Sequence, residues 1–300
     1  MSRPLRLAAA LLAASLSPAA IRAAAEPPRL IVRGDDMGYS HAGNEAIRRC
    51  YKEGVESSVE VLVVSPWFPE AARILAEDKA VDVGLHLSLS SEWDNVKWRP
   101  LTGAPSLRDA DGHFWPMIFP NRNYPGRALV EQKWTVADVE REFRAQIELA
   151  KRRLPGLTHL SGHMGCTDLG PEVKALVARL AKEYGLDISP ADHGVIGVSY
   201  KGAKRTSAEK VGSFVAMVEG LEDGKTYLFV DHPGLDTPEV RAIHHVGYED
   251  VAVDRQGVTD AWTSPEVKEA IRRRGVRLIG YRDLKPGPGA GNAAKPGPSK

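Results

Sequence analysis

Short β-rich runs alternate with stretches of helical periodicity along the chain, and this alternation restricts the fold more than any other feature. The first run, Arg29–Gly34 (RLIVRG), is followed by a helical pattern over His41–Glu53. Strands are predicted at 29–34, 57–64, 81–89, 157–161, 226–230 and 276–280, and helices at 41–53, 67–77, 136–153, from about 171, at 207–219 and from 265. Strands that alternate with helices predict a parallel α/β sheet, either open or closed into a barrel.

The first 25 residues have the pattern of a secretory signal peptide. Arg3 and Arg6 precede the apolar run Leu7–Leu16, and the small residues Ala23–Ala25 offer a cleavage point. The apolar run is too short for a good membrane anchor. We therefore expect an exported protein, periplasmic or secreted, with no membrane anchor after cleavage, and exclude residues 1–25 from the prediction of the fold.

Composition gives no sign of a charged macromolecular partner. The 300 residues are 43% hydrophobic and 26% charged, with a formal net charge of +1, which gives no reason to expect nucleic acid or an anionic membrane as partner. No linker or shift in composition divides residues 26–284, so we predict one domain there. Residues 285–300, rich in Pro, Gly, Ala and Lys, are predicted to be a disordered tail. Both a monomer and a homodimer remain open.

The segment Ser90–Trp134 interrupts the alternation with a long stretch rich in Trp, Pro, Asn and Gly. A loop of this length inside a compact domain is usually functional or a cap. Its aromatic side chains can stack on sugar rings or pack the loop against the domain, and the sequence does not decide between the two. The tryptophans are Trp93, Trp98, Trp115 and Trp134.

Two cysteines, Cys50 and Cys166, are the only ones in the chain. Whether they pair cannot be read from their spacing. Cys166 lies close in sequence to the candidate site described below, and we interpret it as a buried thiol rather than a ligand.

Paired carboxylates follow the first predicted strand, in Asp35-Asp36-Met37-Gly38. Adjacent carboxylates repel each other, and a divalent cation relieves that repulsion. One of them can then bind the cation while the other serves as a general base, and Gly38 allows a tight turn afterwards. A solvated turn with two aspartates is the alternative interpretation.

A histidine lies inside the third predicted strand. Alternation places Gly84, His86 and Ser88 on one face of that strand, opposite Val83, Leu85 and Leu87. Small neighbours leave room beside His86 for something to bind. A satisfied core histidine is the alternative.

The fourth predicted strand ends in a second histidine cluster, Thr158-His159-Leu160-Ser161-Gly162-His163. His159, Ser161 and His163 share one face while the chain stays extended. His163 lies nearest the strand end and is the better-placed ligand. A hydrogen-bonded structural pair of histidines is the alternative.

These motifs place Asp36, His86 and His163 at or near the ends of three strands, where parallel α/β proteins build active sites. One aspartate and two neutral imidazoles suit Zn²⁺ or another divalent transition metal and leave positions open for water and substrate. We therefore predict that the three residues bind one divalent metal ion in a hydrolytic site.

A further histidine, His232, follows the strand predicted at 226–230, in Val230-Asp231-His232-Pro233-Gly234. An imidazole titrates near neutral pH and can protonate a leaving group. A metal ligand and a structural residue before a rigid Pro-Gly turn are the alternatives; the acid role is favoured.

In this order and spacing, the motifs resemble the YdjC-like carbohydrate deacetylases, which include the chitooligosaccharide deacetylases. The resemblance extends from about Leu30 to Leu284. The matching pieces are Asp35-Asp36-Met37-Gly38, Gly84-Leu85-His86-Leu87, Thr158-His159-Leu160 with His163, His232-Pro233-Gly234 and Tyr281-Arg282-Asp283-Leu284.

The resemblance implies a distorted (β/α) TIM-like barrel with mostly parallel strands. It implies one divalent metal ion held by Asp36, His86 and His163. We expect this ion to be Zn²⁺ or Mg²⁺, ahead of Co²⁺ or Mn²⁺. Asp35 carries over as the base and His232 as the acid. The implied substrate is a small carbohydrate that loses an acetyl group from nitrogen.

The chain departs from the family pattern around these residues. Arg33-Gly34 stands where members usually have Asn-Ala. In a cluster that is commonly His-x-Asp-x-His-x-His, Ser161 takes the Asp position and Gly165 the last His position. Such outer groups tune metal affinity and activity. The departures therefore bear on the substrate more than on the metal.

The predicted function is metal-dependent removal of acetyl groups from N-acetylated sugars or oligosaccharides. A metal-dependent esterase or amidase on another acyl substrate is one alternative. A non-catalytic periplasmic carbohydrate-binding protein is another. The retained Asp35 and His232 argue against the latter, because binding alone needs neither a base nor an acid.

Overall fold

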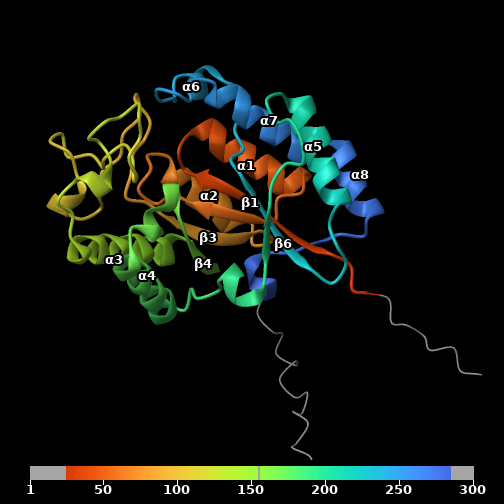
Figure 1. Cartoon of the computed structure of the whole chain (residues 1–300), viewed down its shortest axis with the longest axis horizontal. Helices are drawn as coiled ribbons and strands as arrows, with labels where there is room; N and C mark the ends of the chain where they lie inside the picture. The colour runs from red at the N-terminus through yellow and green to blue at the C-terminus, as the bar shows by residue number, and fades with distance from the viewer. Residues whose placement is uncertain (1–24, 155, 285–300) are drawn as a thin grey trace, which may run out of the picture.

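A parallel β-sheet forms the centre of the molecule (Figure 1). The computed structural model describes residues 25–154 and 156–284. Within these ranges the strands run in the order β4-β3-β2-β1-β6-β5, and β7 pairs with the start of β1. The strands are β1 (Arg29–Met37), β2 (Ser58–Val61), β3 (Asp82–Leu87), β4 (Leu157–Gly162), β5 (Ile196–Val198), β6 (Thr226–Asp231) and β7 (Arg277–Leu278).

Helices cover the outer side of this sheet. In Figure 1, α5, α7 and α8 pack together beside α1, while α3 and α4 pair near β3 and β4. The helices are α1 (His41–Glu53), α2 (Phe68–Glu77), α3 (Val136–Arg153), α4 (Pro171–Tyr184), α5 (Ser207–Glu219), α6 (Pro238–Arg241), α7 (Val251–Thr263) and α8 (Pro265–Arg273). Among the described residues no pairing joins β4 to β5, so the arrangement is a (β/α) barrel left open at that seam. The predicted distorted barrel is confirmed.

Alternation along the strands gives the sheet an apolar outer face and a polar inner face. On β1, Leu30 and Val32 pack into the core formed with α5, α7 and α8, whereas Ile31 belongs to a separate inner cluster. On β3, Val83, Leu85 and Leu87, which alternation placed on the face opposite His86, lie in the core shared with α2, α3 and α4. The inner face carries Arg33, Glu60, His86 and His159. Polar groups buried there must find partners within the protein.

Helix starts follow the local capping signals. Thr135 caps α3 by accepting a hydrogen bond from the Asp138 backbone N–H (3.2 Å). Ser264 caps α8 in the same way, with Pro265 in the first turn. These caps explain why the predicted and observed bounds agree so closely at these helices.

The helix α7 was not predicted from the sequence, although it carries Arg255, which lines the cavity of the candidate site. This helix is buried on most of its sides and contains Gly257, so it shows no single apolar stripe. A Cβ at Gly257 would lie 3.1 Å from the Lys210 side chain on α5, so the glycine allows the two helices to approach closely. Tertiary packing, rather than local preference, forms this helix.

Two predictions about the chain ends fall on residues outside the described ranges. The signal peptide predicted at 1–25 lies almost wholly in residues 1–24, and the predicted tail is 285–300. Within the described ranges, no helix combines the length and apolarity needed to cross a bilayer. Cys50 and Cys166 are buried free thiols and do not pair with each other.

Candidate active site

An irregularity in β1 turns two neighbouring aspartates toward one cavity. In the ladder with β2, Gly34 pairs with Val59 and Met37 pairs with Val61, so β1 holds one extra residue. Asp36 lies at this bulge with φ of +73°, a left-handed conformation that aspartate tolerates better than most residues. Successive strand residues normally face opposite sides, yet Asp35 and Asp36 both line a cavity of about 560 Å³.

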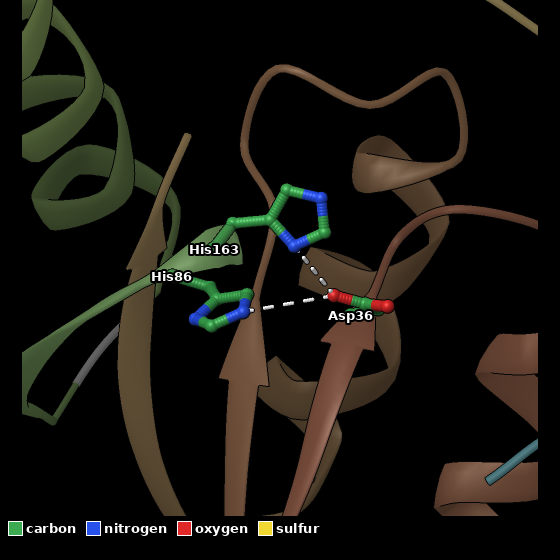
Figure 2. A group of neighbouring side chains, drawn as sticks. All are labelled: Asp36, His86 and His163. Carbon is green, nitrogen blue, oxygen red and sulfur yellow. Dashed lines mark ion pairs between the residues drawn. The ribbon is translucent and has the colours of Figure 1, made fainter. Parts of the chain in front are cut away.

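Two imidazole rings converge on a single oxygen of Asp36 (Figure 2). Its Oδ1 lies 3.1 Å from Nδ1 of His163 and 3.6 Å from Nε2 of His86. His86 comes from β3, and His163 stands directly after β4. All three side chains are buried. The structure thus brings together the three residues that the sequence placed on three separate strand ends.

The outward nitrogens of both imidazoles are also held. Nε2 of His163 lies 3.0 Å from Oε2 of Glu92, and Nδ1 of His86 lies 2.7 Å from Oγ of Ser161. Each ring therefore turns one nitrogen toward Asp36 and has its other nitrogen fixed by a neighbour. Outer contacts of this kind orient metal-ligating histidines.

The second oxygen of Asp36 is neutralised by Arg255 from α7. The Arg255 Nη2 donates to Asp36 Oδ2 at 2.8 Å. Its guanidinium lies 4.5 Å from the centre of the Tyr39 ring and 5.2 Å from that of Trp93. These rings position the cation by favourable cation–π contact.

Electrostatics favour an ionised Asp36 and a neutral His86. Burial alone raises the pKa of Asp36, but His163, His232 and Arg255 outweigh it and hold that pKa well below the usual range. Burial is the largest influence on His86 and lowers its pKa. Burial also lowers the pKa of His163, yet Glu92 and Asp36 raise it to about 10. A cation that binds here would displace a proton from His163.

A divalent cation fits these residues. In the metal-free protein, a proton on His163 Nδ1 pairs with the buried Asp36 Oδ1 at 3.1 Å. A divalent cation can replace this proton and pair with the same carboxylate oxygen. One carboxylate oxygen and two imidazole nitrogens, all within 4.8 Å of one another, form the donor set of a catalytic zinc-type site. Asp36, His86 and His163 would hold the ion.

The two residues predicted for proton transfer border the same cavity. Asp35 forms a two-point ion pair with Arg33, at 2.8 Å from Nε and 2.9 Å from Nη2, and its Oδ2 lies 3.7 Å from His86 Nε2. His232 follows β6, with Nε2 3.8 Å from Asp36 Oδ2. The side chain of His232 is 38% exposed, so it can reach a bound molecule. Burial lowers the pKa of His232, but Asp36 and the hydrogen bond to Asp231 raise it overall.

The tryptophan-rich segment 90–134 mainly packs. Trp93 and Trp98 are buried, and Trp98 Nε1 donates to the Ser90 carbonyl at 2.7 Å. Trp115 and Trp134 pack against the core. The observed contacts favour the packing interpretation of these rings over sugar stacking, although Trp93 also lines the cavity. The segment contributes Glu92 to the site as well.

Cys166 is the buried thiol that the sequence suggested. Its Sγ donates to the Leu87 carbonyl at 3.0 Å, and burial raises its pKa well above the usual range. A thiol in this state is neither a nucleophile nor a ligand.

The room expected beside His86 is occupied by protein. A Cβ at Gly84 would lie 2.5 Å from both carboxylate oxygens of Glu60 and from Nε2 of His159. The expectation that this space takes a ligand was wrong, because a neighbouring strand fills it.

Three charged residues in or beside the site were not predicted from the sequence: Glu92 and Arg255, which line the cavity, and Glu60, which contacts Ser161 behind His86. Glu60 left a usable signal, a lone carboxylate inside the apolar run Val59–Val63, on the strand face opposite the outer core. Glu92 and Arg255 left none, because one lies in an irregular loop and the other on a helix without an apolar stripe.

Fold and site together define an α/β barrel protein with a titratable cluster at the carboxyl ends of β1, β3 and β4. The pattern of the YdjC-like protein family matches residues 29–273, and the chain belongs to that family.

Named relatives extend this comparison. A carbohydrate deacetylase of Geobacillus stearothermophilus is 29% identical over 265 residues, covering 86% of this chain and 98% of the relative. A carbohydrate deacetylase of Enterococcus faecalis is 27% identical over 275 residues, covering 85% and 98%. One from Thermus thermophilus reaches 36% identity, but over 157 residues, 52% of this chain and 51% of the relative.

A solved structure shares the fold. The crystal structure of an Enterococcus faecalis protein, described as a candidate cellobiose-phosphate cleavage protein, superposes with a TM-score of 0.66 at 22% identity. The match covers 86% of this chain and 99% of that one. At this level of identity, the similarity concerns the architecture.

Proposed function

We propose that this protein is a metal-dependent deacetylase that removes the N-linked acetyl group from N-acetylated sugars or oligosaccharides. The observation that carries the proposal is the convergence of the His86 and His163 imidazoles on one buried oxygen of Asp36. The choice of a sugar deacetylation reaction is supported by relatives that bear the name carbohydrate deacetylase. Two nitrogen donors favour Zn²⁺ or Co²⁺ over Mg²⁺, which prefers oxygen ligands.

The chain's own residues supply proton transfer on either side of the cluster. A bound divalent ion supplies Lewis-acid polarisation of the acetamide carbonyl and acidifies water. Asp35, oriented by Arg33, accepts the proton of the water that attacks the carbonyl carbon. The C–N bond breaks, His232 gives a proton to the departing amine, and the products are acetate and the free amino sugar. Arg255 keeps Asp36 ionised and in place throughout.

The cavity suits a small carbohydrate. Its volume of about 560 Å³ lies within the range of small-molecule sites. Its lining combines the polar cluster with the rings of Trp93, His245 and Tyr248. Polar groups in such a site can pair with sugar hydroxyls while the rings contact the apolar faces of the sugar.

Acetate release tests this function. Metal-stripped protein is incubated with N-acetylated oligosaccharides, with O-acetylated glycans and with small acetamides, before and after addition of Zn²⁺ or Co²⁺. We expect acetate from the N-acetylated sugars only after metal addition, and its loss with a chelator. Release from esters or simple amides alone would establish the esterase or amidase alternative. Sugar binding without acetate release under any metal would establish a binding protein.

We also propose that the chain is exported. The support is the signal-peptide pattern together with the position of Glu26, whose carbonyl accepts a hydrogen bond from the Gly224 N–H at 2.6 Å. Cleavage after Ala25 would leave that contact intact. N-terminal sequencing of the protein recovered from its native cells should begin at or near Glu26; an intact Met1 would contradict export by cleavage.

A further inference from the structure

Glu60 is a fully buried carboxylate on the polar inner face of the sheet, away from the hydrophobic core. It lies on β2 opposite Gly84 in the ladder with β3 and is 0% exposed. The absence of a side chain at Gly84 creates the space that its carboxylate occupies. A buried charge at this position is expensive unless the surroundings pair it.

Both oxygens of this carboxylate are paired with donors. Oε1 lies 2.5 Å from Nε2 of His159, whose ring is stacked on Tyr281 with centroids 3.4 Å apart and planes 5° from parallel. Oε2 accepts the hydroxyl hydrogen of Ser161. Burial raises the pKa of Glu60, but His159 and then Arg33 outweigh it and lower that pKa to about 2. An ionised carboxylate only accepts hydrogen bonds.

The proton count at Ser161 determines the state of His86. A serine hydroxyl carries one hydrogen, and here it points to Glu60. The 2.7 Å contact between Ser161 Oγ and His86 Nδ1 must therefore use a hydrogen carried by the imidazole. In a neutral ring this leaves Nε2 with its lone pair, and Nε2 is the nitrogen that faces Asp36 Oδ1 at 3.6 Å.

We propose that Glu60, acting through Ser161, is a positioning residue that fixes His86 as the Nδ1–H tautomer and keeps Nε2 free to bind the cation. This inference rests on the proposed metal-dependent function and deepens it. His163 receives the equivalent support directly, from Glu92. The serine at position 161 of β4, where the resembling family carries aspartate, is thus compensated by a carboxylate from β2, on the far side of β3.

Single substitutions should disturb the tautomer in defined ways. Ser161→Ala removes the acceptor of the His86 Nδ1–H. Glu60→Gln introduces an amide that can donate to Ser161, which allows the serine hydroxyl to turn and donate to His86 Nδ1. That turn moves the ring proton to Nε2 and blocks metal coordination. We expect each variant to weaken Zn²⁺ or Co²⁺ binding about 10- to 100-fold.

A compensating substitution separates this relay from a general structural effect. Ser161→Asp places a carboxylate directly beside His86 Nδ1. In the Glu60→Gln background it should restore metal affinity to within a few fold of the wild type. The double variant Glu60→Gln with Ser161→Ala should bind metal as well as whichever single variant has the lower metal affinity. The two effects should not add, because both changes break the same chain of contacts.

The experiment combines two measurements on the full chain. Nitrogen-15 NMR of histidine-labelled, metal-free protein reports which ring nitrogen of His86 carries hydrogen, with His86→Gln identifying its signals among the nine histidines. Chelator competition gives the dissociation constant for Zn²⁺ or Co²⁺. Glu142→Gln is the matched control, because Glu142 is equally buried but accepts from Leu101 and Thr102.

We expect Nδ1–H in the wild type and in the Glu142→Gln control, and loss of that state in Ser161→Ala and Glu60→Gln. An Nε2–H tautomer in the wild type would overturn the inference, as would unchanged metal affinity in Ser161→Ala. If the wild type binds no metal but shows the Nδ1–H tautomer that both variants lose, the proposed function fails and the relay stands.

Discussion

Gly84→Ala is the substitution whose cost can be worked out most directly from the structure. The added Cβ would lie 2.5 Å from both oxygens of Glu60 and from Nε2 of His159. That is about 1 Å closer than comfortable carbon contacts. The carboxylate cannot simply swing aside, because both oxygens hold buried donors, and Glu60 and Gly84 are ladder partners on adjacent strands.

Two effects therefore add. Overpacking of a well-packed interior costs about 1–3 kcal/mol. Displacing the carboxylate weakens at least one hydrogen bond to a charged group, which is worth about 1.5–3 kcal/mol. We expect the free energy of unfolding of metal-free Gly84→Ala to fall by about 3–5 kcal/mol in urea titrations.

Gly197→Ala is the matched control. Gly197 also lies within a strand, β5, but a Cβ there would meet nothing within 4 Å. Its free energy of unfolding should stay within about 0.5 kcal/mol of the wild type. If Gly84→Ala is as stable as Gly197→Ala, the packing of Glu60 and His159 against β3 is not as described.

Three further substitutions test separate parts of the site. Asp35→Asn should keep metal affinity while acetate release falls about 100- to 10,000-fold, as expected for loss of a general base; unchanged release would remove that role. Arg255→Met leaves Asp36 buried without its partner and should lower the free energy of unfolding of metal-free protein by about 3–5 kcal/mol; equal denaturation midpoints would contradict this. Burial, and then Asp35, raise the pKa of Glu56 well above the usual range, so the folded protein retains a proton that the unfolded chain releases. Stability from this group should fall by up to about 1.4 kcal/mol per pH unit above about pH 4.5, and Glu56→Gln should remove that slope. In urea denaturation, the wild type and Glu56→Gln should have similar free energies of unfolding at pH 4, and the variant should be the more stable at pH 8. A parallel pH dependence of the two free energies would refute the raised pKa of Glu56.

The fold was predictable where local signals and tertiary packing agree. The capping residue Thr135 and the amphipathic pattern after it defined α3, and the apolar run around Leu30 defined β1. Three elements could not be read from local sequence: α6, α7 and β5, of which α6 is only four residues long. The helix α7 has no apolar stripe because it is buried on most sides, and β5 is only three residues long.

The residues at the centre of the site could be named from sequence because strand ends in a parallel sheet share one edge. The residues that support this centre from behind could not be named from the sequence. Arg255 reaches Asp36 from a position 219 residues away. The path from Glu60 to His86 depends on the register of three adjacent strands. The space for the Glu60 carboxylate depends on Gly84, whose lack of a side chain suggested room for a ligand instead.

Metal stoichiometry tests the central claim most directly. Stripped wild-type protein is dialysed against Zn²⁺, and bound metal per chain is measured by elemental analysis, alongside Asp36→Ala, His86→Ala and His163→Ala. We predict one tightly bound ion per wild-type chain and none at the same free Zn²⁺ concentration in each variant. An equal metal content in the wild type and all three variants would show that these residues do not hold the ion.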